Sequence, residues 1–444
     1  MSSSGALNRE GHRRQRARSG DGFWRARILA GCLGLAVMCQ AASPDWQAVL
    51  ASDAADSSVW PNRISRANGD QWLAEHHDRI RLMRPRLLVI NFANRTPRPH
   101  LDKLVQDLIA ALAESSRYRG YQNADAPAFL QYRLFKFVDL REAGNPQPTS
   151  SHFPLKREVK EGFNVDYGAF FSAAFAAQLG VRDPSAGGRF LRLDELVERG
   201  LVHELWFTLD HDDSVRAFEC VELKPQYDES FVPHSSKFVQ AGNGGDPDQQ
   251  WTGRSLRLGC INATRGIGCF LESLSHSIDG MANSKAIPYF TRYFHEFAAH
   301  DLDKRFGDFP WPSFYPLWGE DKGVHYPDPS TAVVRFGPRT YTLTNYVAYG
   351  GNAHFPPNGR RHYDLENTNA VYSTIEDWRS GRGENGRDRA VLWTNERFAR
   401  YREQAPDCMG PWLIYWRQNF PGFGNLQKDD AGRPMKNWWP FLFY

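Results

Sequence analysis

The side chains best suited to chemistry stand together between positions 265 and 284: they are Glu272, His276, Asp279 and Asn283. Their spacings of four, three and four are the neighbour relations of a helix surface. On a helix, the apolar residues of the same stretch fall on the opposite face. One face thus gathers two carboxylates, an imidazole and an amide. It is either the wall of a site or an ordinary solvated surface.

His276 and Asp279 are three residues apart, a spacing that lets both side chains reach one ion or one substrate group. His354, within residues 351–358, can supply a third ligand, and Glu219 a fourth ligand or a general base. Two histidines and two carboxylates suit zinc or another divalent ion, which activates water. Without a metal, His276 held by Asp279 can act as a general base. The alternative is that the helix face is solvated and His354 braces a turn.

Alternating strand and helix patterns precede this face. Residues 86–92 form a nearly continuous apolar run, typical of a strand covered on both faces. Similar runs predict strands at 129–140, 201–209 and 255–263, and helical spacing predicts helices at 101–112, 165–179, 191–199 and 266–283. We therefore expect an α/β fold with a mainly parallel sheet and helices on both faces. Ligands bind beyond the carboxyl ends of such strands.

The composition changes along the chain. Residues 43–84 are polar and interrupted by proline and glycine, which predicts a leader segment. Residues 85–285 hold the α/β pattern. Residues 286–444 are rich in aromatic residues, proline and glycine, which predicts an aromatic-rich, irregular C-terminal cap packed on the α/β domain. The tryptophans of this cap suit sugar rings, although tryptophan also fills cores.

The first 42 residues have the pattern of a signal peptide. Seven arginines and two acidic residues occupy positions 1–27, a 12-residue apolar run follows, and Cys39-Gln-Ala41 suits cleavage. We expect a secreted or periplasmic protein. Removing residues 1–27 changes the formal charge from +3 to 3 − 5 = −2, so no nucleic-acid partner is expected. No later apolar run of about 18 residues predicts a membrane span.

Four cysteines remain after cleavage: Cys220, Cys260, Cys269 and Cys408. In an oxidising compartment they can pair in three ways. Four buried free thiols are the alternative.

Residues 264–268, Thr-Arg-Gly-Ile-Gly, resemble a phosphate-cradling turn between a strand and a helix. The third glycine of the dinucleotide fingerprint is replaced by Leu271. A tight turn that allows close packing of the helix is the better interpretation.

A combination of motifs spans about residues 85–440. It consists of Arg86-Leu-Leu-Val-Ile-Asn-Phe92, Val202-His-Glu-Leu-Trp206, Phe218-Glu219, the His276 helix, His354-Phe-Pro-Pro-Asn358, Tyr363-Asp364, Asp377-Trp378 and Asn437-Trp-Trp439. It resembles a family of exported bacterial α/β proteins to which no activity is firmly assigned. The family helix reads Gly-His-x-x-Glu, so Ser275 and Asp279 depart from it. The resemblance implies that His276, Asp279, His354 and Glu219 act as a set.

The hypothesis with most support is an exported hydrolase with a polar cleft between sheet and cap. It would act on an extracellular peptide or glycan, with a divalent metal such as zinc as the candidate cofactor. The alternative is a non-catalytic protein that binds surface carbohydrate with the cap tryptophans. In both cases the partner is a polymer or small ligand outside the cytoplasm.

Overall fold

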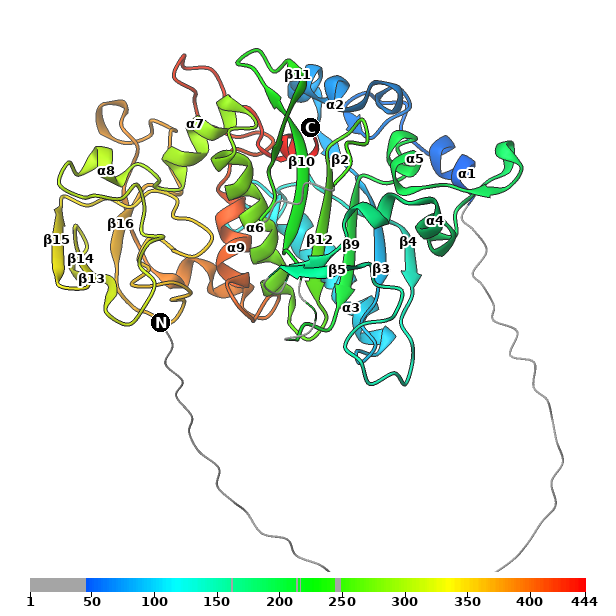
Figure 1. Ribbon diagram of the computed structural model, residues 1–444. Helices are drawn as coiled ribbons and strands as arrows, with labels where there is room; N and C mark the ends of the chain where they lie inside the picture. The colour runs from blue at the N-terminus through cyan, green and yellow to red at the C-terminus, as the bar shows by residue number, and fades with distance from the viewer. Residues whose placement is uncertain (1–44, 161–162, 213–214, 216, 244–248) are drawn as a thin grey trace, which may run out of the picture. The chain divides into compact units, whose positions relative to one another are not determined.

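A six-stranded sheet is the largest sheet in the computed structural model, which describes residues 45–160, 163–212, 215, 217–243 and 249–444 (Figure 1). The signal peptide expected at residues 1–42 lies outside the described residues. The strand order is β11-β10-β12-β9-β3-β4. The strands are β3 (Arg86–Asn91), β4 (Arg133–Asp139), β9 (Glu204–Leu209), β10 (Cys220–Tyr227), β11 (Pro233–Gln240) and β12 (Leu256–Asn262).

The expectation of a mainly parallel sheet with helices on both faces is wrong, because the sheet is mixed and several small antiparallel sheets accompany it. Strands β12, β9, β3 and β4 are parallel neighbours, whereas β10 is antiparallel to both β12 and β11. The connections explain the direction of β10. Parallel strands need a crossover of a dozen or more residues, and only residues 210–219 separate β9 from β10. Residues 228–232 then close a hairpin to β11.

Three helices pack on one face of the sheet: α3 (Arg98–Ser115), α6 (Ile267–Asn283) and α9 (Gly410–Gln418). Every residue of α9 is buried, as expected for a helix with other elements all around it. Figure 1 shows α9 beside α6. Among the described residues, the opposite face lacks such a layer of long helices: it is covered largely by loops and the 3-10 turn η2 (Gly168–Phe171), with only the short helices α4 (Ala173–Leu179) and α5 (Leu193–Glu198) among them.

The N-terminus of α6 is filled by a carboxylate of the chain itself. The Asp407 side chain accepts hydrogen bonds from the backbone N–H groups of Gly268, at 2.7 Å, and Cys269, at 3.2 Å. A Cβ atom at Gly268 would lie 2.0 Å from the carbonyl oxygen of Asp407. The glycines of this turn therefore serve close packing, and the position that a phosphate would take is occupied.

Residues 286–444 are less irregular than expected. They contain α7 (Pro288–Phe297), α8 (Leu302–Arg305), the 3-10 helices η4 (Glu384–Gly386), η5 (Asn395–Tyr401) and η6 (Trp439–Phe443), an antiparallel sheet of β13 (Lys322–Asp328), β14 (Thr331–Phe336) and β15 (Arg339–Thr344), and the pair β16 (Val371–Ser373) and β17 (Val391–Trp393). The β13–β15 sheet has a hydrophobic core of its own. Helix α9 and η6 instead belong to the core that covers the large sheet.

Most tryptophans of this region fill the core. Trp378, Trp393, Trp412, Trp416, Trp438 and Trp439 are each at most 3% exposed, whereas Trp318 is 52% exposed. Most of the tryptophans that were candidates for binding sugar rings are therefore covered by protein.

The segment before the large sheet also packs into the molecule. It contains α1 (Trp46–Ala51), β1 (Val59–Trp60), α2 (Ser65–Glu75), the 3-10 turn η1 (His77–Arg79) and β2 (Leu82–Met83). Trp60, Trp72 and Met83 join the core on the α3 and α9 side. Two further strand pairs are small: β5 (Leu155–Lys160) with β6 (Phe163–Val165), and β7 (Arg182–Asp183) with β8 (Arg189–Phe190). The 3-10 turn η3 (Pro184–Ala186) connects β7 to β8, and α5 follows β8 in the chain.

None of the helices in the described part of the chain is both long enough and apolar enough to cross a membrane.

The turn before α6 provides a test of the packing. We expect Gly268→Ala to lower the free energy of unfolding by about 1–3 kcal/mol, because the new methyl group overlaps the backbone at Asp407. Gly307 has open space around it, so Gly307→Ala is the matched control and should stay within about 0.5 kcal/mol of the parent protein. Urea denaturation measures both. Equal stability of the two variants would contradict the close packing.

Candidate metal centre

Helix α6 carries two of three side chains whose polar atoms converge. Glu272 and His276 are four residues apart and so share one face of the helix. Glu272 Oε1 and His276 Nε2 are 2.7 Å apart. Glu272 is only 5% exposed. Its carboxylate therefore faces other protein segments and needs partners among them.

The third side chain, His354, comes from a loop that α9 holds in place. The Asn352 side chain accepts hydrogen bonds from two successive backbone N–H groups, the first being that of His354, an arrangement typical of asparagine turns. The indole N–H of Trp412 donates to the carbonyl oxygen of Asn352 at 3.0 Å, and that of Trp416 donates to Gly351 at 3.2 Å. Both tryptophans are fully buried in α9. The loop thus has a fixed position beside α6.

His354 Nε2 lies 2.7 Å from Glu272 Oε1 and 2.8 Å from His276 Nε2. Within the described ranges, these three residues form the one group of histidine, cysteine or acidic side chains whose ligand atoms all lie within 4.8 Å of one another. Two histidines and a glutamate are the protein ligands of several catalytic zinc sites, in which a further position stays open for water or substrate. The donor set therefore fits zinc.

The other ring nitrogen of His354 is held by a second histidine. His354 Nδ1 and His362 Nδ1 are 2.8 Å apart, and His362 Nε2 donates to the carbonyl oxygen of Tyr315 at 3.0 Å. Burial and the neighbouring His354 lower the pKa of His362 to about 4, so this ring is neutral. Because Nε2 of His362 carries the proton, its Nδ1 accepts one from His354. The lone pair of His354 Nε2 is then free to bind a metal.

Asp279 supports His276 in a similar way. Its Oδ2 lies 3.5 Å from His276 Nδ1 and accepts a hydrogen bond from the Tyr315 hydroxyl at 2.8 Å. A carboxylate on this side holds the Nδ1 proton, so that Nε2 is the nitrogen that would bind a metal beside Glu272. Asp279 is therefore a positioning residue here and not one of the three converging groups.

The electrostatics of the three groups also favour a cation. Burial lowers the pKa of His276, but hydrogen bonds to Asp279 and Glu272 outweigh it and raise that pKa to about 10. Burial raises the pKa of Glu272, yet the bonds from His276 and His354 lower it overall. Two imidazole nitrogens 2.8 Å apart that also face one carboxylate oxygen cannot all be satisfied by protons in the usual positions. A divalent ion held by Glu272, His276 and His354 would satisfy all three lone pairs.

Tyr363 approaches the same point from the solvent side. Its hydroxyl is 3.0 Å from Glu272 Oε1 and 3.1 Å from His354 Nε2, and its side chain is 42% exposed. Its φ of +61° lies in the left-handed region, which is strained for a bulky residue. Burial and the charge of Glu272 raise the pKa of Tyr363. The strained backbone thus holds a protonated phenol against the three ligand atoms.

Glu219, immediately before β10, lies close enough to feel the charges of the centre without joining the three-residue group. Its Oε2 accepts a hydrogen bond from the Asn243 amide at 2.6 Å. Burial and the Glu272 carboxylate raise the pKa of Glu219, while His276 and His354 lower it to a smaller extent. A half-buried carboxyl group with a raised pKa suits proton transfer.

The cysteines supply neither a disulfide nor a ligand. Cys220, Cys260, Cys269 and Cys408 are all free thiols, so no disulfide joins them. Cys408 Sγ lies 3.9 Å from Glu272 Oε2. Burial and this carboxylate raise the pKa of Cys408 to about 12, which keeps the thiol protonated.

The sequence named His276, Asp279, His354 and Glu219, and the structure brings all four into one neighbourhood with different roles. It missed Glu272 as a ligand, although the spacing of Glu272 and His276 was visible. It also missed the parts played by His362, Tyr315 and Tyr363, since a chain of hydrogen bonds and a positive φ leave no periodic signal.

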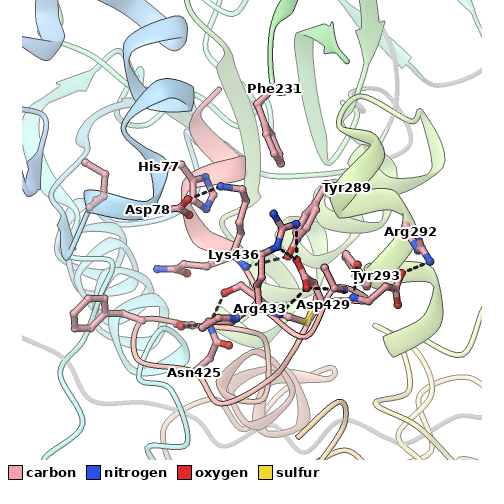
Figure 2. A pocket seen from close by; sticks show the side chains of 18 of the residues that line it. His77, Asp78, Phe231, Tyr289, Arg292, Tyr293, Asn425, Asp429, Arg433 and Lys436 are labelled. Carbon is pink, nitrogen blue, oxygen red and sulfur yellow. Dashed lines mark hydrogen bonds and ion pairs between the residues drawn. The ribbon is translucent and has the colours of Figure 1, made fainter. Parts of the chain in front are cut away.

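A cavity of about 870 Å³ lies away from the metal centre, among η1, α7 and residues 422–437 (Figure 2). Several charged groups along it pair with each other: Lys436 with Asp78 at 2.7 Å, Arg433 with Asp429 at 2.8 Å, and Arg292 with Asp430. None of the residues at the metal centre lines it. Size alone therefore does not identify the functional site.

Comparisons of the chain with protein-family models, with curated proteins and with solved structures find no match. The resemblance to an exported bacterial family stays a prediction, and the functional argument depends on the geometry of the site.

Metal binding can be tested with substitutions of the ligands. We expect His276→Ala and Glu272→Gln to lose bound zinc, and His362→Phe to bind it about 10–100-fold more weakly, because His354 loses the partner that orients it. Elemental analysis and competition with a chromophoric chelator measure this. The exposed His325 provides the control variant His325→Ala. Unchanged zinc affinity in His276→Ala would exclude the centre.

Zinc should also stabilise the fold, because His354 lies 78 residues from His276 in the sequence and the three ligands meet only in the folded chain. At a free zinc concentration about 100 times Kd, we expect the free energy of unfolding to rise by about 2.7 kcal/mol. Denaturation with zinc and with EDTA measures the difference. His276→Ala should lose this response, and an equal response in that variant would point to binding elsewhere.

Proposed function

We propose that the protein is an exported, metal-dependent hydrolase that acts on an extracellular peptide or glycan. The observation that carries the proposal is the convergence of Glu272 Oε1, His276 Nε2 and His354 Nε2 within 2.7–2.8 Å of one another. Export is supported by the arginine-rich start and the apolar run of residues 28–39.

The ion, when bound, supplies Lewis acidity and lowers the pKa of water, which is the chemistry of hydrolysis. The chain's own residues have separate tasks. Glu219 takes up the proton from the attacking water and returns it to the leaving group, a role for which its raised pKa is suited. Tyr363 donates a hydrogen bond from its phenol to the oxygen on which negative charge develops.

Asp279 and His362 keep the two imidazoles oriented and need not touch the substrate. The proposed site thus contains three metal ligands, a general base (Glu219), a hydrogen-bond donor (Tyr363) and two positioning residues. A carbohydrate-binding protein that relies on the cap tryptophans has less support, because six of them are at most 3% exposed.

The first experiment combines elemental analysis of the purified protein with assays of peptide and glycan hydrolysis. We expect about one zinc per chain and an activity that EDTA removes and zinc restores. Bound zinc together with failure to hydrolyse either class of polymer would contradict the proposed reaction.

The assignments of Tyr363 and Glu219 can be tested separately from metal binding. We expect Tyr363→Phe to lower kcat by about 10²–10³-fold and Glu219→Gln by about 10²–10⁴-fold, with the zinc content unchanged in both. Steady-state kinetics with the substrate identified above measures this. Tyr372 is similarly exposed but lies on β16, so Tyr372→Phe is the control. Full activity in both site variants would refute the assigned roles.

A further inference from the structure

We propose that the cavity beside the metal centre binds a neutral, hydroxyl-rich carbohydrate chain; this inference rests on the proposed function and specifies its substrate class. The cavity has a volume of about 400 Å³ and shares His276 and Asp279 with the centre. Its other polar lining comes from Asn243, Asn283, His300, Ser313 and Tyr315. A polymer in this cavity would lie against His276, one of the three proposed metal ligands.

An unsatisfied carboxylate oxygen points to a ligand that donates hydrogen bonds. Asp279 is 5% exposed, and while its Oδ2 accepts from Tyr315, its Oδ1 has no partner. His300 Nε2 in the same cavity also lacks a partner. Buried polar atoms without partners are rare in native proteins and indicate a missing ligand or water. Hydroxyl groups of a sugar can donate to Asp279 and either donate to or accept from His300.

The charges around the cavity favour a neutral ligand. The Asp279 carboxylate lines the cavity, and no lysine or arginine occurs among the described residues around it, so a phosphate or carboxylate group would meet a like charge and no cationic side chain. Burial lowers the pKa of His300, which leaves that ring uncharged. A divalent ion held by Glu272 and the two histidines would carry a net positive charge, which would offset the attraction of Asp279 for an ammonium group.

An exposed aromatic side chain, Trp318, follows the lining residue Pro316 by two positions in the chain. Tyr315 and Pro316 line the cavity, and the chain then reaches Trp318, whose indole ring stacks on His362 with centroids 3.5 Å apart and planes at 21°. Trp318 is 52% exposed although it lies next to buried metal-site residues. An aromatic ring with one face supported by protein provides a flat apolar surface for a sugar ring. It would take a sugar unit of the chain next to the one in the cavity.

Affinity electrophoresis of the zinc-loaded protein tests the inference. The gels contain a neutral polysaccharide (β-glucan, xylan or mannan), anionic polygalacturonate, cationic chitosan or casein. We expect at least one neutral polysaccharide to retard the protein, and we expect no retardation by polygalacturonate, chitosan or casein. Trp318→Ala should weaken that binding about tenfold with unchanged zinc content, whereas the exposed Tyr372→Ala should behave like the parent protein. Binding to none of the neutral polymers, preference for casein or a charged polymer, or unchanged binding in Trp318→Ala would overturn the inference.

The two proposals fail in distinguishable ways. Zinc-dependent hydrolysis of a peptide without glycan binding would overturn the glycan inference and leave the metal-dependent hydrolase in place. Binding of a neutral polysaccharide that depends on Trp318 in a protein without a zinc site would support the cavity assignment and overturn the hydrolase.

Discussion

Two hydrogen bonds from buried indole groups hold the two parts of the metal centre together. Trp412 and Trp416 of α9 donate to the backbone carbonyls of Asn352 and Gly351, and α9 packs directly against α6. A buried carbonyl that lost its donor would remain desolvated and unpaired. The distance between His354 on the loop and Glu272 on the helix therefore depends on the packing of a helix that supplies no ligand.

Tyr315 plays a comparable role on the opposite side of the site. Its hydroxyl donates to Asp279, and its carbonyl oxygen accepts from His362. Asp279 in turn orients His276, and His362 orients His354. One residue thus couples the orientation of both imidazoles, and a shift of the segment around it would disturb them together. The orientation of the two imidazoles that a metal ion needs is thus supported by one side-chain bond and one backbone bond of Tyr315.

Local patterns allowed much of the centre to be predicted from the sequence. The apolar face of residues 267–283 predicted helix α6, and apolar runs predicted β3 and β9, because those signals depend on neighbouring residues only. Strand β10 was not among the predicted strands, so its antiparallel direction was missed together with the strand itself. The β13–β15 sheet was not predicted, because its strands lie in a part of the chain whose aromatic residues, prolines and glycines indicated an irregular cap. The contribution of Tyr363 depends on a left-handed backbone conformation, which no pattern of residue types specified.

The order in which the chain supplies its core has a consequence for folding. Strand β3 begins at Arg86, whereas the helix that completes the cover of this face, α9, begins at Gly410. Part of the apolar face of the sheet therefore stays uncovered until α9, more than three hundred residues further along the chain, packs on it. Contacts of such high sequence separation form slowly and leave intermediates prone to aggregation. Efficient folding of this protein therefore depends on how well that surface is shielded until α9 has been synthesised.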